Sequence, residues 1–203
     1  MKQYKDHYFQ KAKQEQYPAR SVYKLQEMDK RFQLLQKGQY ILDLGAYPGS
    51  WSMFAGKRIG GKGRILAVDR AEPEEVLPDN VEFYLADVLE GGEELERVLE
   101  GYSGFHLVLS DMAPLTTGIK IRDQALSLEL AEQALEYARN HLHTGGNAVI
   151  KIFEGPDVPD FRKELKTVFT RVRSFKPKGS RSESKENFLL GLGRREIDSD
   201  KEE

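Results

Sequence analysis

Short apolar runs of strand length recur along the chain and alternate with segments of helical periodicity. The expected strands are residues 40–44, 64–68, 81–85, 106–110, 148–153, 170–175 and 188–192. The expected helices between them are residues 51–59, 93–99, 124–142 and 159–169. Seven strands that alternate with helices predict an α/β fold with a doubly wound, mostly parallel sheet and helices on both faces.

Both ends of the chain depart from this simple alternation. Before the first strand, residues 21–37 have a helical pattern that Gly38 should end. The apolar side chains of this helix are spaced three or four apart, at Val22, Leu25, Met28, Phe32 and Leu35. At the other end, no helical pattern separates residues 170–175 from 188–192. We therefore expect an antiparallel hairpin at the sheet edge, joined by the loop KPKGSRSESKE.

Length and composition fit one domain. The chain has 203 residues, of which 39% are hydrophobic and 32% charged, as in ordinary globular proteins. We assign residues 1–195 to a single domain that begins with a basic helical extension at 1–37, and we expect a disordered acidic tail at 196–203. No apolar run approaches the ~20 residues of a membrane span, and the polar start lacks the apolar core of a secretory signal.

Cysteine is absent from the sequence. This excludes disulfide scaffolds, thiolate zinc sites and cysteine nucleophiles. It also fits a reducing compartment, so we expect a cytoplasmic protein, and we expect it to be a monomer.

The formal net charge of −2 conceals a segregation of charge along the chain. Four segments alternate in sign, at +5 for residues 1–37, −9 for 38–150, +6 for 151–195 and −4 for 196–203. Local fields rather than the total charge attract a polyanion, so the basic segments are candidate nucleic-acid contacts. The strongest candidates are Lys2–Arg31 and Arg162–Lys185. The alternative is that both are ordinary solvated surfaces.

A glycine-rich turn follows the first expected strand, in the sequence DLGAYPGSW. It matches neither the dinucleotide fingerprint GxGxxG nor the phosphate loop GxxxxGK(S/T). Gly45 and Gly49 lack a Cβ atom and so allow a ligand to approach the backbone closely. Asp43 would repel a pyrophosphate but attract a cationic amino acid. This charge pattern favours S-adenosylmethionine, which carries sulfonium and ammonium groups, over a nicotinamide dinucleotide.

Two further acids come at the ends of the next two strands. Asp69 follows RILAV, where a carboxylate can accept hydrogen bonds from ribose hydroxyls. Asp87 follows EFYLA, where it could accept one from an adenine amino group. Each alone would more often be a loop or helix-capping aspartate, but acids after three successive strands favour a cofactor site. Trp51 either packs in the core or forms a wall of that site.

A second set of charged residues could carry chemistry. Asp111 follows the fourth strand, and Lys151 lies among apolar residues in the fifth. A lysine buried there must pair with an acid or serve the reaction, because an unpaired buried charge is costly. Lys24, in the first helix, and Glu186, at the start of the last strand, would taken alone be surface charges. None of the four histidines has metal-ligand spacing with an acid pair, so we predict no metal site.

Several motifs occur in a specific order along the chain. They are ARSVYKL, DLGAYPGSWS, GGKGRILAVD, the acid at Asp87, SDMAP, VIKIFEG and SRSESKENF. From about Ala19 to Arg195 this order resembles the FtsJ-type ribosomal RNA 2′-O-ribose methyltransferases. The chain departs from the family pattern at Tyr47 and Ser50, where small residues are common. It also has LTTG after SDMAP, where Asn-x-Ser-Gly is more usual.

The resemblance implies a Rossmann-like class I methyltransferase fold and transfer of a methyl group from S-adenosylmethionine to a ribose 2′-hydroxyl. It implies a catalytic tetrad, made of Lys24, Asp111, Lys151 and Glu186. It also implies cofactor contacts from Gly49, Trp51, Asp69, Asp87 and Asp111. The expected substrate is RNA, with a uridine of large-subunit ribosomal RNA first. The alternatives are transfer RNA with the same chemistry, or a catalytically inactive RNA-binding protein, which the complete tetrad disfavours.

The tetrad members would divide the work of one proton transfer. Lys151 would be the general base, because a 2′-hydroxyl is a weak nucleophile and must lose its proton during attack. Lys24 would favour the neutral form of that base by like-charge repulsion and steady the oxyanion. Asp111 would orient Lys151, and Glu186 would position the cluster or the ribose. Burial favours a neutral Lys151 and nearby carboxylates favour a charged one, so the sequence leaves its protonation state open.

Overall fold

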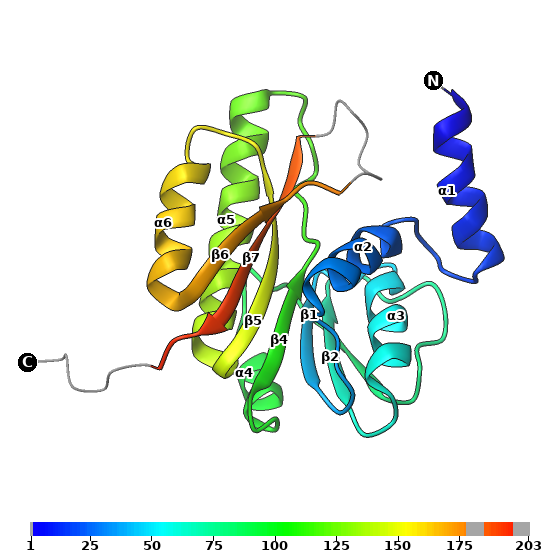
Figure 1. The fold of residues 1–203 in the computed structure, drawn as a ribbon, viewed down its shortest axis with the longest axis horizontal. Helices are drawn as coiled ribbons and strands as arrows, with labels where there is room; N and C mark the ends of the chain where they lie inside the picture. The colour runs from blue at the N-terminus through cyan, green and yellow to red at the C-terminus, as the bar shows by residue number, and fades with distance from the viewer. Residues whose placement is uncertain (1, 178–184, 197–203) are drawn as a thin grey trace, which may run out of the picture.

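The computed structural model describes residues 2–177 and 185–196, which form a sheet between two layers of helices (Figure 1). The strands are β1 (Tyr40–Leu44), β2 (Arg64–Asp69), β3 (Val81–Leu85), β4 (Phe105–Ser110), β5 (Leu142–Phe153), β6 (Phe169–Phe175) and β7 (Glu186–Arg194). The helices are α1 (Lys2–Gln14), α2 (Val22–Phe32), α3 (Ser50–Ile59), α4 (Glu93–Glu100), α5 (Lys120–His141) and α6 (Val158–Val168). The predicted doubly wound α/β fold is confirmed.

The strand order of the sheet is β3-β2-β1-β4-β5-β7-β6. All neighbours from β3 to β5 pair in parallel, whereas β7 runs antiparallel to both β5 and β6. The predicted antiparallel hairpin is thus confirmed, and it enters the sheet with β7 inside and β6 at the edge. The winding direction reverses between β1 and β4, which is where sheets of this class bind ligands beyond the carboxyl ends of their strands.

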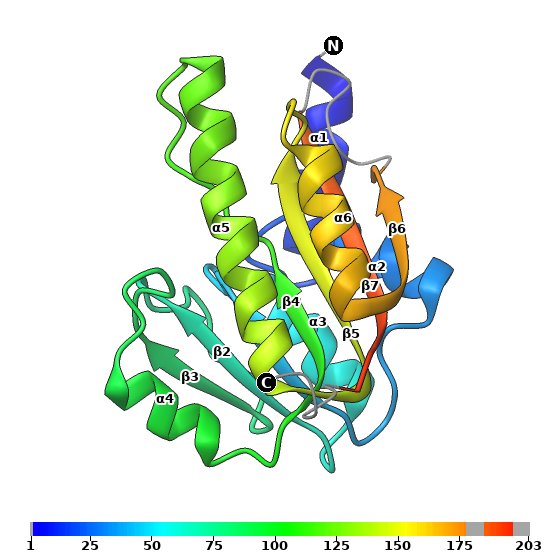
Figure 2. The same cartoon turned by 90° about the vertical axis from the view of Figure 1, so that its left-hand side faces the viewer.

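Strand side chains alternate between two hydrophobic cores, as the period of a strand requires. Leu42 of β1 and Ile150 of β5 join the core under α4, α5 and α6. Ile41 and Val149, one position away, join the core under α2 and α3. Figure 2 shows α5 and α6 together over the first of these faces. Odd-numbered residues of β1 and β5 therefore face α2 and α3, which decides where the charged residues of these strands point.

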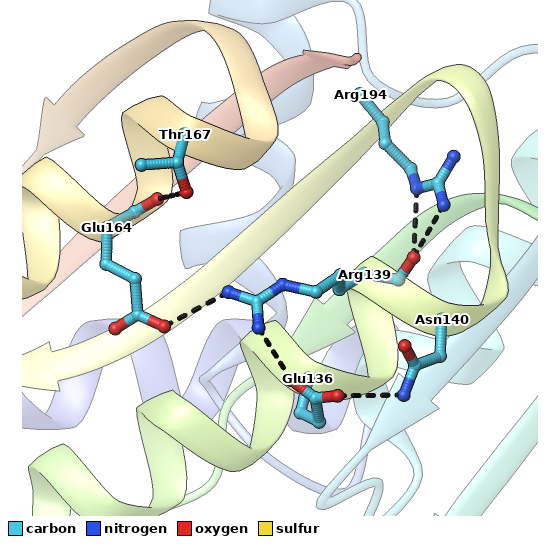
Figure 3. Close-up of polar contacts among 6 residues, drawn as sticks. All are labelled: Glu136, Arg139, Asn140, Glu164, Thr167 and Arg194. Carbon is cyan, nitrogen blue, oxygen red and sulfur yellow. Dashed lines mark hydrogen bonds and ion pairs between the residues drawn. The ribbon is translucent and has the colours of Figure 1, made fainter. Parts of the chain in front are cut away.

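A polar cluster ties the end of α5 to α6 and β7 (Figure 3). The Arg139 guanidinium pairs with Glu136 and Glu164 at 3.0 and 3.1 Å. Nε and Nη2 of Arg194, the last residue of β7, donate to the backbone oxygen of Arg139 at 3.0 and 2.7 Å. Because Glu186 is at the opposite end of β7, this cluster fixes the strand that carries it.

The predicted helix at 21–37 is shorter than expected, and Gly38 does not end it. α2 ends at Phe32, because Gln33 adopts a left-handed conformation with φ 53°. The buried Asp29 carboxylate accepts a hydrogen bond from the Leu35 N–H at 2.8 Å and holds the chain after this turn. The basic extension at its other side is a separate helix, α1, which packs on α2 and α3 through Ala12.

Two other boundaries differ from the expected ones by four residues or more, and the remaining ones by two at most. α5 begins at Lys120, four residues before the predicted start. β5 begins at Leu142 rather than at residue 148, because the ladder with β4 continues through a register shift that lies between Phe105 and Leu107. Gly145, with φ 84°, accommodates this irregularity.

None of the helices in the described ranges is both long and apolar enough to cross a membrane. Residues 178–184 and 197–203 lie outside the described ranges. The disordered acidic tail therefore stays a prediction, as does the division of the chain into one domain at 1–195.

Candidate active site

Charged residues gather at the carboxyl ends of β1, β4 and β5, on the face covered by α2 and α3. Asp43 and Lys151 share the strand parity of Ile41 and Val149, and so point to that face. Asp111 directly follows β4. Glu186 opens β7 two residues before Phe188, which packs in the same core. Strand alternation and the order of the sheet thus bring four distant parts of the chain to one place.

The four predicted tetrad residues are in mutual contact. Lys151 Nζ lies 2.9 Å from Asp111 Oδ1 and also donates to the backbone oxygen of Asp111. Lys24 Nζ lies 3.8 Å from the same Oδ1 and 3.0 Å from Glu186 Oε2. The side chains form a row of alternating charge, in the order Lys151, Asp111, Lys24 and Glu186. Two residues that resemble surface charges in the sequence are therefore part of one cluster.

Burial distinguishes the two lysines of this cluster. The Lys151 side chain is 4% exposed and that of Lys24 is 14% exposed. An ammonium has three donors, and two of those on Lys151 are directed at Asp111. The ammonium of Lys24 sits 5.7 Å from the centre of the Phe188 ring, at the outer side of the cluster. Lys151 is thus the oriented, inner amine and Lys24 the one nearer to solvent.

α3 holds α2, and with it Lys24, in place. The Trp51 indole N–H donates to the backbone oxygen of Ser21 at 2.9 Å, and the Ala19 N–H donates to Ser50 Oγ at 2.8 Å. Trp51 itself is 3% exposed and its ring lies 5.9 Å from that of Phe188. In the structure Trp51 is therefore a core residue beneath the tetrad, while its contact with a cofactor stays a prediction.

The glycine turn packs tightly against the segment after β4. Gly45 has φ 74°, and a Cβ atom there would lie 2.5 Å from Met112 Cγ and 3.1 Å from Met112 Cα. Gly49 has φ 107°, a conformation that side chains rarely adopt. Glycine is therefore required at both positions, and the turn lies directly beside Asp111.

Asp43 is buried and incompletely satisfied. Its Oδ2 accepts a hydrogen bond from Ser52 Oγ at 2.6 Å, whereas Oδ1 has no partner among the described residues. Burial raises the pKa of Asp43 to about 7; the negative charges of Asp111 and Asp69 add to this shift, and the Ser52 hydrogen bond opposes it. A buried carboxylate oxygen without a donor fits a cationic ligand group at this turn.

The other two predicted cofactor acids hold their own loops. Asp69 accepts hydrogen bonds from the N–H groups of Tyr47 and Ala71 at 2.9 and 3.1 Å. Asp87 accepts one from the Leu89 N–H at 2.9 Å and lies 4.0 Å from the guanidinium of Arg70. The loop interpretation therefore describes both residues in the structure. Their contacts with a ribose and an adenine stay predictions.

Sequence reasoning missed three residues that shape the site. Ser52 donates to Asp43, Met112 abuts the glycine turn, and Phe188 lies under the ammonium of Lys24. Phe188 could have been found, since it is two positions beyond Glu186 on a strand and so shares its face. Ser52 and Met112 stand inside the motifs DLGAYPGSWS and SDMAP, but their residue types alone do not indicate these contacts.

The two basic segments contact each other, and the first of them reaches the tetrad. The Arg31 guanidinium of α2 lies 5.4 Å from the centre of the Phe175 ring of β6, and Lys24 of α2 contacts Glu186 at the start of β7. Lys178 and Arg181 of the second segment lie outside the described residues, as do the side chains of residues 2–6.

Comparison with known proteins gives concordant results. A family model described as FtsJ-like methyltransferase matches residues 17–194. Proteins named Ribosomal RNA large subunit methyltransferase E are similar along nearly their whole length. The one from Oleidesulfovibrio alaskensis is 56% identical, over 95% of this chain and 93% of the relative. The one from Bdellovibrio bacteriovorus is 46% identical, over 94% and 97%.

A solved structure from Plasmodium falciparum, assigned as a ribosomal RNA methyltransferase, shares the fold. Its TM-score with this chain is 0.76 at 28% identity, and the match covers 88% of this chain and 98% of the other.

Proposed function

Because the chain belongs to the FtsJ-like methyltransferase family, we propose that it transfers a methyl group from S-adenosylmethionine to a ribose 2′-hydroxyl of large-subunit ribosomal RNA, with a uridine as the expected nucleotide. The names of the similar proteins support ribosomal RNA as the substrate. The observation that carries the ribose chemistry is the contact of Lys151 with Asp111 at 2.9 Å inside the four-residue cluster. That arrangement offers an oriented amine to a hydroxyl proton.

The cofactor would lie beyond the carboxyl ends of β1, β2 and β3. When bound, S-adenosylmethionine supplies an electrophilic methyl group on a sulfonium centre. The unpartnered oxygen of Asp43 fits its cationic amino-acid end, and the glycine turn lets that end approach the backbone. Asp69 and Asp87 would receive the ribose and the adenine, and Trp51 would support the turn from below.

Lys151 would take the proton of the 2′-hydroxyl at its Nζ atom. Asp111 holds that atom through both its carboxylate and its backbone oxygen, so the amine has little orientational freedom left to lose. Lys24 places a positive charge on the far side of the same carboxylate, where it would stabilise a developing oxyanion. Glu186 holds Lys24 and could accept a ribose hydroxyl.

RNA would be bound by the two basic segments Lys2–Arg31 and Arg162–Lys185. Contacts with phosphates position an RNA without reading its sequence, and they make its affinity fall steeply with salt. An RNA substrate in the ribosome would also locate the enzyme in the cytoplasm. A flat salt response would show that these segments are ordinary surface.

The test is methyl transfer from labelled cofactor to assembled large subunits, naked ribosomal RNA and transfer RNA in parallel. We expect label in ribosomal RNA, and mapping of the labelled nucleotide identifies the site. A 2′-O-methyl group blocks alkaline cleavage of the adjacent phosphodiester, so resistance to alkali separates ribose from base methylation. Label in transfer RNA alone would show that transfer RNA, and not ribosomal RNA, is the substrate. Tight RNA binding without any methyl transfer would show that the chain is a catalytically inactive RNA-binding protein.

A further inference from the structure

A short segment between β4 and α5 exposes aliphatic side chains beside the site. Leu115, Ile119 and Ile121 are 80%, 60% and 80% exposed. Single exposed aliphatic residues are ordinary on protein surfaces. Here, however, three of the eight large exposed hydrophobic residues in the described ranges fall within seven positions. Such clustering is typical of an interaction surface, and we call these three side chains the apolar tip.

The backbone that carries the apolar tip is held in place. The buried Asp123 carboxylate accepts hydrogen bonds from the N–H and the hydroxyl of Thr117 at 2.7 and 2.8 Å. Thr117 Oγ1 in turn accepts one from the Ile119 N–H at 3.2 Å. These donors lower the pKa of Asp123 and so keep its carboxylate ionised. The aliphatic side chains are therefore presented on an ordered turn.

Positive charges alternate with the apolar tip. Lys120 and Arg122 are exposed, and in the part of the chain that the structure describes neither of them makes an ion pair. Lys185, just before β7, is near enough to contribute to the lowered pKa of Asp123. Unstacked RNA offers matching chemistry, since its bases have apolar faces and its phosphates are negative. This pairing of charge and apolar surface favours RNA over a protein as the occupant.

The apolar tip begins a short way along the chain from the reacting groups. Leu115 is four residues beyond Asp111, so their Cα atoms are at most about 14 Å apart. Figure 2 shows the first turns of α5 extending well past the end of β4. The tip thus extends outward beyond the carboxyl end of β4, the end of the strand that Asp111 directly follows, and there the neighbours of a bound nucleotide would pass.

We propose that the apolar tip packs against unstacked bases next to the ribose that accepts the methyl group, while Lys120 and Arg122 bind the flanking phosphates. This inference rests on the proposed function and assigns the part of the protein that holds the RNA open at the target. Aliphatic side chains that enter a base stack are a general means of unstacking it.

The first experiment separates apolar from ionic contacts on a naked large-subunit ribosomal RNA transcript. Replacing Leu115, Ile119 and Ile121 together by serine should raise the KM for the transcript about tenfold, as loss of a base contact does, with kcat preserved. The slope of affinity against salt should not change. Lys120→Ala with Arg122→Ala should instead reduce that slope by about two. The matched control is Val76→Ser, which removes an aliphatic side chain that is 92% exposed elsewhere.

The second experiment measures base unstacking without turnover, with S-adenosylhomocysteine in place of the cofactor. 2-Aminopurine is placed beside the mapped nucleotide. The fluorescence of the 2-aminopurine should rise when the RNA is saturated with the wild-type protein or with the Lys120→Ala, Arg122→Ala variant. It should not rise with the triple-serine variant. Wild-type behaviour of the triple-serine variant in both experiments would overturn the proposal.

Two further outcomes keep this proposal distinct from the proposed function. A defect of the triple-serine variant on assembled subunits but not on naked RNA would identify a ribosomal protein as the occupant and overturn the RNA contact. RNA affinity measured without cofactor does not depend on methyl transfer. If no RNA is methylated while the triple-serine variant still loses affinity, the proposed function fails and the RNA contact stands.

Discussion

The two halves of the site balance their charges in different ways. In the tetrad, two lysines and two acids contact one another within 3.8 Å, and each charge has an opposite neighbour. At the glycine turn, Asp43 is buried with one oxygen unpartnered in the described structure. The tetrad is therefore organised before any substrate arrives. The turn carries a cost in the free protein that a cationic ligand would relieve.

The largest effect should come from removing the inner amine of the tetrad. Lys151→Met keeps most of the side-chain volume but deletes the proton acceptor. We expect methyl transfer to fall by about 10³-fold, within the usual range for a general base, with cofactor affinity nearly unchanged. Single-turnover transfer and calorimetric titration with the cofactor measure the two separately.

The control for this prediction is Lys24→Met, which deletes the outer amine. Lys24 contacts Asp111 at 3.8 Å rather than 2.9 Å and lies nearer to solvent, so its loss should cost less transfer than the loss of Lys151. If Lys151→Met loses cofactor affinity while bound complex still transfers at the normal rate, the assignment of the base is wrong.

Asp43→Asn should give an intermediate effect confined to the other half. It removes the charge that would attract the cationic end of the cofactor, while the amide can still accept the hydrogen bond from Ser52. We expect cofactor affinity to fall about tenfold or more, as for loss of a buried charge-assisted contact. Transfer from saturated complex should be nearly normal. An unchanged cofactor affinity would contradict the contrast between the two halves.

The same variant should change how stability depends on pH. The pKa of Asp43 is about 7 in the folded protein, against an ordinary value of 3.8 for an aspartate in an unfolded chain. Between these values the folded state binds the proton more strongly, so this group lowers the free energy of unfolding as pH rises from about 4 to 7. Urea unfolding without cofactor should therefore show Asp43→Asn gaining on the wild type across this interval, with a constant difference above it.

More of the fold than of the candidate site could be predicted from the sequence. Alternating apolar runs indicate the order of the elements, and one face of each strand follows from the period of two. The family resemblance is needed for Lys24 and Glu186, which are 162 positions apart and contact only because β7 enters the sheet beside β5. No local sequence pattern predicts the contact between Lys24 and Glu186.

Other features could not be predicted from the sequence because single hydrogen bonds determine them. α2 ends where Gln33 adopts a left-handed conformation and the Asp29 carboxylate accepts a hydrogen bond from the Leu35 N–H. The helical spacing of apolar residues nevertheless continues to Leu35. The sequence indicates a charge facing a ligand at Asp43, but the raised pKa of this residue depends on burial that only the packed structure reveals.

The smallest predicted effect tests whether the two halves are mechanically connected. Ser50 follows Gly49 of the glycine turn, and its hydroxyl accepts the Ala19 N–H just before α2. Ser50→Ala removes this bond and should lower the free energy of unfolding by about 1 kcal/mol. If the bond also positions Lys24, kcat should fall several-fold while cofactor affinity stays unchanged. This loss is much smaller than the ~10²-fold loss that a 1 Å displacement of a reacting group can cause.

The pairing of Ser50→Ala with Lys24→Met decides between the two roles. If Ser50 acts by positioning Lys24, the double variant should have the same kcat as Lys24→Met alone, because there is then no amine left to misplace. If Ser50 only stabilises the fold, the single variant should keep its kcat and lose unfolding free energy alone. Additive losses in kcat would show that the glycine turn influences the tetrad through something other than Lys24.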